Sequence, residues 1–177
     1  NFVSRKILES EIGLSRNKFS EFYKKMKSLG ILIEEDNKIV GSIHLGQNFT
    51  KIGYFISRPS NSNYDSMASG GTNLAQTNPK LIENIDNRRD EIFARFKDNN
   101  IPIDLLTTSS SGLDPHISKN SAIFQIKTIA KERNLDIKSI EKIVEKHIEK
   151  RYLGIIGEER VNVLLLNIAL DKEFGKL

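Results

Sequence analysis

The chain has 177 residues, enough for one full domain or for one domain with a small appendage. Its 38% hydrophobic and 28% charged residues are typical of a globular protein, and the absence of cysteine excludes disulfides and thiolate metal sites. The longest apolar runs, such as 163–166, are far shorter than the ~20 apolar residues of a membrane-spanning helix. The sequence as given therefore predicts a soluble protein.

The net charge of +4 is concentrated at the N-terminal end, because residues 1–30 carry seven Lys/Arg and three acids. Apolar spacing predicts a short helix at 4–12, a turn at Gly13, and a second helix from an N-cap at Ser15 to about Leu29. Gly30 stands where a C′ glycine would end that helix. Strands at 31–34 and 38–43 follow and predict a hairpin.

This order of elements has the spacing of a helix-turn-helix followed by a wing, and a basic helix start of this kind meets DNA in the major groove. Two features depart from the motif: Glu9 occupies a position where a small residue is usual, and no preceding helix is present. The alternative is an amphipathic helical hairpin used for dimerisation or docking. The predicted DNA-binding residues are Ser15, Arg16, Asn17, Lys18, Ser20, Lys24, Lys25 and Lys27.

The centre of the chain is irregular, with a loop at 58–78 that is rich in Ser, Asn, Gly and Thr. Beyond it, Asn78 and Pro79 begin a predicted helix that runs to about Phe96. The remaining predicted elements are a strand at 103–107, a turn at 108–115, helices at 118–133 and 136–150, and a strand or helix start at 160–167 that leads into a helix to about 174.

Two groups of residues are candidates for ligand binding. Backbone amides of the glycine-rich segment could cradle a phosphate with added charge from Arg58, whereas the alternative is a glycine-rich Ω-type loop packed on the domain. Asp114 and His116 could be imagined as metal ligands, but Asp114-Pro115 is turn chemistry, so we expect no metal site. The candidate ligand- or nucleotide-binding residues of the loop are Arg58, Ser69, Gly70, Gly71, Thr72 and Asn73.

Long literal stretches, in order along the chain, resemble the KdpC family, the C subunit of the Kdp-type potassium-transporting ATPase. They cover roughly three quarters of the chain, from about Asn37 to Asp171. The stretches are 41–50, 53–55, 57–60, 64–65, 68–74, 77–79, 104–118, 130–135 and 161–170.

The resemblance implies an α+β module that is anchored by one N-terminal membrane helix and assembles with the subunits KdpA and KdpB near the potassium entrance. It implies no catalytic residues, and it places Gln125 at a family position proposed to contact nucleotide, so ATP or another nucleotide is a possible ligand. Where the family has its membrane helix, this chain has the basic helical segment. We therefore expect an α+β protein with a helix-turn-helix-like segment at 1–36 and a KdpC-like domain at 37–177.

Three functions follow from these expectations. The first is a cytoplasmic, DNA-binding transcriptional regulator linked to potassium uptake, a homodimer that uses the KdpC-like domain as a sensor or partner-binding module. The alternative is a non-catalytic accessory subunit that stabilises the potassium-transporting P-type ATPase with KdpA and KdpB, associated with the membrane through the pump complex. The third is a KdpC-like nucleotide-binding protein.

Overall fold

The computed structural model describes residues 16–35 and 38–177, so the predicted helix at 4–12 lies outside the described residues. The first described elements are helix α2 (Arg16–Ser28) and the antiparallel hairpin of β1 (Leu32–Glu35) and β2 (Lys38–Ser42). Gly30 ends α2 with φ of 69°, a conformation that glycine adopts without a steric penalty. The Gly30 amide donates to the Lys27 carbonyl and the Ile31 amide to the Met26 carbonyl, both at 3.0 Å, which confirms the predicted C-terminal cap.

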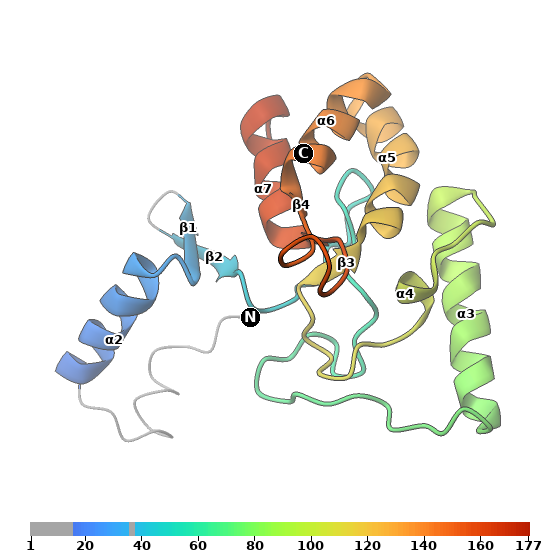
Figure 1. Ribbon diagram of the computed structural model, residues 1–177, viewed down its shortest axis with the longest axis horizontal. Coiled ribbons are helices and arrows are strands. Elements are labelled where there is room, and N and C mark those ends of the chain that lie inside the picture. Colours follow the sequence, from blue (N-terminus) through green and yellow to red (C-terminus); the bar gives the residue numbers. More distant parts are fainter. Residues whose placement is uncertain (1–15, 36–37) are drawn as a thin grey trace.

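The centre of the molecule is a small three-stranded antiparallel sheet with the strand order β3-β5-β4. Helices α5, α6 and α7 lie together over this sheet, and α3 and the one-turn helix α4 lie at the other end of the molecule from α2 (Figure 1). Helices and small antiparallel sheets together confirm the α+β class. The bounds are α3 Pro79–Phe96, α4 Ile103–Leu106, β3 His116–Ser118, α5 Lys119–Arg133, α6 Ile137–His147, β4 Ile148–Glu149, β5 Arg160–Asn162 and α7 Val163–Phe174.

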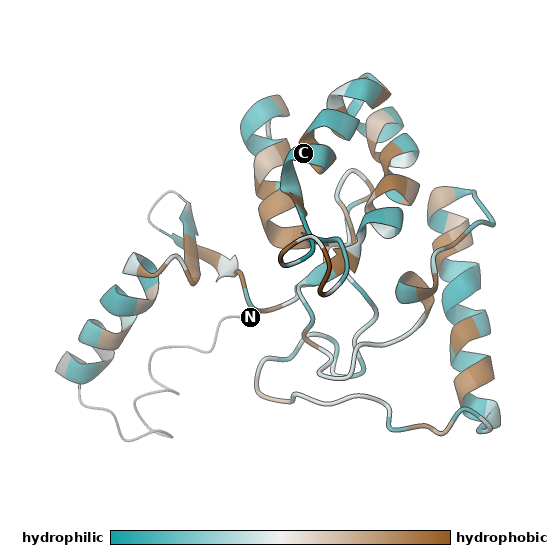
Figure 2. Cartoon of the chain, viewed as in Figure 1, coloured by the Kyte–Doolittle hydropathy of each residue, from teal (hydrophilic) through white to brown (hydrophobic). Residues whose placement is uncertain are grey.

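One hydrophobic core joins the sheet to its helices. The N-terminal half of α7 is a continuous apolar segment (Figure 2), which fits its burial between the sheet and α6. Removal of this apolar surface from water is the main favourable term in folding. Fully buried core side chains include Phe55, Leu105, Ile117, Ile129, Ile140, Val161, Leu166 and Leu170.

Two predicted elements differ from the structure. The predicted strand at 103–107 is instead the one-turn helix α4, Ile103–Leu106, because this turn buries Leu105 and brings the Asp104 carboxylate to the start of α5. The helix predicted at 136–150 ends at His147, where the chain extends into β4 to pair with β5. Asp136 does occupy the N-cap of α6, but its side chain forms no capping hydrogen bond.

Candidate functional site

Two loops, 57–74 and 107–115, pack against each other and form what we call the loop face. The Gly70 amide donates to the Ser111 carbonyl at 2.8 Å, and the Ser69 hydroxyl donates to the same carbonyl at 3.2 Å. The Asn61 amide group reaches the Gly71 carbonyl at 3.3 Å. The loop therefore packs as the Ω-type alternative described, with the Gly70 amide already used by the protein. A phosphate cradle at residues 69–73 stays a prediction.

Glycines allow this close packing of the two loops. A Cβ on Gly112, whose φ is +68°, would lie 2.9 Å from the Gly70 carbonyl oxygen. A Cβ on Gly71 would lie 3.0 Å from the Ser110 carbonyl oxygen. Side chains at these positions would push the loops apart, so these glycines set the shape of the loop face.

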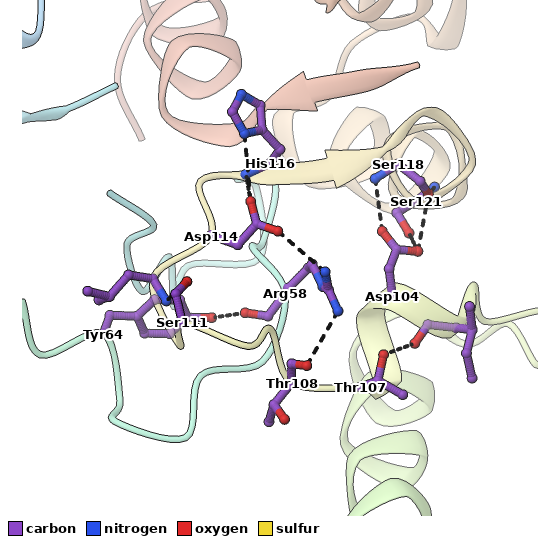
Figure 3. Close-up of polar contacts among 12 residues, drawn as sticks. Arg58, Tyr64, Asp104, Thr107, Thr108, Ser111, Asp114, His116, Ser118 and Ser121 are labelled. Carbon is purple, nitrogen blue, oxygen red and sulfur yellow. Dashed lines mark hydrogen bonds and ion pairs between the residues drawn. The ribbon is translucent and has the colours of Figure 1, made fainter. Parts of the chain in front are cut away.

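Arg58 lies at the centre of the loop face, between the two loops (Figure 3). Its guanidinium donates to the Asp114 carboxylate at 3.3 Å and to the Thr108 carbonyl at 3.4 Å. The carbonyl of Arg58 accepts a hydrogen bond of 2.7 Å from the Tyr64 hydroxyl. The side chain of the predicted ligand residue Arg58 thus links 57–74 to 107–115, and its backbone carbonyl holds Tyr64 within 57–74.

Asp114 links the loop face to the central sheet. Its carboxylate accepts from the His116 amide at 2.9 Å and lies 3.6 Å from His116 Nδ1, while His116 Nε2 lies 3.3 Å from the Glu149 carboxylate. Burial favours the neutral form of the Asp114 carboxyl. The hydrogen bonds from His116 and the charge of Arg58 outweigh that effect and hold the pKa of Asp114 below its ordinary value. Within 16–35 and 38–177, no group of three or more His, Asp or Glu could hold a metal ion.

Asp104 fixes the other end of the 104–118 segment. Its carboxylate accepts from the Ser118 amide at 2.8 Å, the Ser118 hydroxyl at 3.1 Å and the Ser121 hydroxyl at 2.5 Å (Figure 3). A carboxylate at a helix N-terminus is favoured by the unpaired amides and the helix dipole. This role of Asp104 was not identified from the sequence, because residues 103–107 were predicted to form a strand.

Two hollows border the loop face. One, of about 500 Å³, lies beside the Arg58–Asp114 pair and is lined by the serines of the 109–111 segment. The other, of about 300 Å³, lies between α3 and the loops and includes Thr72 in its lining. Arg58 and Ser69 line the first hollow, so the structure brings these two predicted residues together, while Thr72 lies in the second.

Gln125 lies inside the core with no exposed surface. Its Oε1 accepts from the Ile56 amide at 2.8 Å, and its Nε2 donates to the carbonyls of Ile56 at 3.3 Å and Ser121 at 3.1 Å. A nucleotide would reach this amide only after α5 separated from the 55–56 segment. Nucleotide contact at Gln125 therefore stays a prediction, and the structure gives the residue a packing role.

Asn167 on α7 binds the backbone of Phe55 as Gln125 binds that of Ile56, and it was not identified from the sequence. Its Oδ1 accepts from the Phe55 amide and its Nδ2 donates to the Phe55 carbonyl, both at 2.9 Å. Phe55 and Ile56 lie outside any strand, so the two amides replace the backbone partners that a sheet would supply. An isolated Asn inside the apolar run 163–170 was the available signal.

The predicted DNA-binding residues lie on or beside α2. Ser15 is outside the described residues, and Arg16 and Asn17 form the first turn of α2. Lys27 pairs with Glu34 of β1, and the pKa of Lys27 is raised mainly by that hydrogen bond and charge. Lys18, Lys24 and Lys25 are exposed, and Ser20 is half-buried. Along the described ranges, no helix is both long enough and apolar enough to cross a bilayer.

Comparison with known proteins gives a consistent match to a single family. The family model described as "K+-transporting ATPase, c chain" matches residues 15–172. A protein of Caldanaerobacter subterraneus named potassium-transporting ATPase KdpC subunit is 45% identical over 150 residues, which cover 83% of this chain and 78% of the relative. A protein of the same name in Mycobacterium tuberculosis is 44% identical over 81% of this chain and 78% of the relative. Another in Koribacter versatilis is 40% identical over 86% of this chain and 80% of the relative.

The hypothesis of a DNA-binding transcriptional regulator is wrong. Helix α2 and the hairpin β1–β2, which that hypothesis assigned to DNA recognition and a wing, lie within the region that matches the family model. The expected homodimer and the cytoplasmic location were inferred from DNA binding and lose that basis with it. From Ser15 through α7, the chain belongs to the KdpC family.

Proposed function

We propose that this chain is a non-catalytic accessory subunit of a potassium-transporting ATPase and acts within a membrane-associated pump complex. The observation that carries the proposal is the family match over residues 15–172, with relatives of 40–45% identity that are each named as a KdpC subunit. The partners we expect are the KdpA and KdpB subunits of the same pump.

The loop face is the surface we propose for contact with those subunits. Its charged side chains are engaged within the chain, since Arg58 pairs with Asp114 and Asp114 in turn receives hydrogen bonds from His116. Ser110 and Ser111 remain exposed on its rim. A loop surface that is held in shape before binding loses less conformational entropy on association, which favours a stable complex.

Co-expression tests the proposal. The tagged chain is co-expressed with KdpA and KdpB, and the complex is purified in detergent and assayed for potassium-stimulated ATP hydrolysis. We expect co-purification and loss of stimulated hydrolysis when this chain is omitted. A chain that purifies alone, with a pump that is fully active without it, contradicts the proposal.

A pair of variants tests the loop face separately. Ser110→Arg places a large charged group on the exposed rim of the loop face, and Asn99→Arg makes a comparable change at an exposed position in the loop after α3. We expect the first variant to weaken co-purification and the second to retain it. Equal behaviour of the two variants would place the subunit contact elsewhere on the chain.

A further inference from the structure

The turn between β4 and β5 exposes a group of large apolar side chains, which we call the apolar tip. Its members Tyr152, Leu153, Ile155 and Ile156 are 71%, 76%, 81% and 62% exposed. Three of these values are higher than that of any other large apolar side chain in the described part of the protein. Figure 2 shows the apolar stretch on the turn between the two strands. Burying these side chains against a partner would remove a large apolar surface from water.

The backbone of the apolar tip is closed on itself. Tyr152 and Ile156 exchange hydrogen bonds, with the Tyr152 amide 2.8 Å from the Ile156 carbonyl and the Ile156 amide 3.0 Å from the Tyr152 carbonyl. The Gly154 amide donates to the Arg151 carbonyl at 3.0 Å, and the Ile155 amide to the Tyr152 carbonyl at 3.2 Å. Entry into an apolar medium is costly for unpaired backbone groups, and these internal bonds lower that cost.

The charges beside the apolar tip leave an excess of positive charge. At its base, Glu149 pairs with Arg160 at 2.8 Å and Lys119 with Glu159 at 3.1 Å. Lys150 and Arg151, directly before the tip, form no ion pair among the residues that the structure describes. The acid that follows the tip, Glu158, forms none among them either, so these three residues leave one net positive charge. Two free cations next to an apolar turn match the chemistry of a bilayer with anionic headgroups.

We propose that the apolar tip inserts into the interface of an anionic lipid bilayer, with Lys150 and Arg151 at the level of the lipid phosphates. Tyrosine is favoured at this depth because its ring is apolar and its hydroxyl remains in contact with water. A fluid bilayer can surround a turn whose apolar side chains are this exposed, whereas a protein would need a matching socket. This inference goes beyond the proposed function and does not depend on the pump assembly.

A single tryptophan reports insertion directly, because the chain contains none. Tyr152→Trp in the full chain is titrated with vesicles of phosphatidylcholine, with and without phosphatidylglycerol. We expect a blue-shifted emission that is quenched by bromine-labelled acyl chains, and stronger partition into the anionic vesicles. Emission that does not change with either kind of vesicle overturns the proposal.

Variants in the Tyr152→Trp background separate the two contributions. Ile155→Ser with Ile156→Ser removes apolar surface, and we expect a loss of about tenfold or more in partition into both kinds of vesicle. Lys150→Gln with Arg151→Gln should weaken partition by about tenfold into anionic vesicles only.

The matched control is Ile82→Ser with Ile103→Ser, which removes two isoleucines that are 54% and 68% exposed on α3 and α4. It should bind like the parent. An equal loss of partition in this control overturns the proposal. So does a blue shift that appears only with the co-purified pump subunits in detergent and not with lipid, because the tip then does not insert into the bilayer.

Discussion

Replacement of Asn167 by leucine tests how the buried 55–56 segment is held. Asn167 is 2% exposed and binds both backbone polar groups of Phe55, the amide and the carbonyl, at 2.9 Å. Leucine has nearly the same size, so Asn167→Leu keeps the volume of the side chain and removes its polar atoms. The two backbone groups of Phe55 then remain buried without partners.

The expected cost follows from those two groups. An unsatisfied buried donor or acceptor costs about 1–3 kcal/mol, so Asn167→Leu should lower the free energy of unfolding by about 2–6 kcal/mol. Gln125→Leu should have a similar effect, since its amide binds both polar groups of Ile56 and the Ser121 carbonyl. These values would be large fractions of the total stability of a domain of this size.

Urea-induced unfolding followed by circular dichroism measures the change, with Asn84→Leu as a matched control at an exposed position of α3. The control should remain within about 0.5 kcal/mol of the wild type. If Asn167→Leu unfolds at the same urea concentration as this control, the segment is not held by the buried amides. The same argument for Gln125 would then fail as well.

Further substitutions at Asp104, at Gly112 with Gly30 for comparison, and at Asp114 are tested by the same unfolding assay. Asp104→Ala removes the carboxylate that accepts from two serines at the start of α5 and should cost about 2–4 kcal/mol; a loss below about 1 kcal/mol would contradict that role. Gly112→Ala and Gly30→Ala both place alanine at a positive φ, which costs roughly 1–2 kcal/mol. Only the first also forces a contact of 2.9 Å, so it should be the more destabilising, and the opposite order would refute the packing of the loops. Because the pKa of Asp114 is lowered in the folded state, its contribution to stability is complete above the ordinary value of 3.8 and is lost as the pH falls through the folded-state pKa. The stability of the wild type should therefore fall more steeply with acid than that of Asp114→Asn. Parallel curves for the two proteins would contradict this.

Most helices could be predicted from the sequence because their ends carry local signals. Asn78 caps α3 with a hydrogen bond to the Lys80 amide, Ser118 caps α5, and Gly30 ends α2, all at the predicted positions. It failed at 103–107, where the structure is decided by contacts distant in sequence. The burial of Leu105 and the bonds from Asp104 to α5 depend on segments more than ten residues away, which a local pattern does not contain.

The error over DNA binding has the same physical origin. A basic helix followed by a hairpin is a local pattern compatible with many contexts, and Lys27 of that helix pairs with Glu34 of the hairpin rather than projecting freely. The literal stretch 104–118, by contrast, contains residues that each bind a distant partner. A pattern that specifies long-range contacts identifies a fold, whereas a charged helix identifies only a surface.

The same distinction separates structure from function across the loop face and the core. The polar groups most suggestive of chemistry, Arg58, Asp114 and Gln125, are engaged with the chain itself, so they hold loops and core segments in place. The groups that remain exposed are of another kind. They are Ser110 on the loop face and the apolar tip around Ile155. The loop face and the apolar tip are therefore the two surfaces that we propose for contacts outside the chain, the first with the pump subunits and the second with lipid.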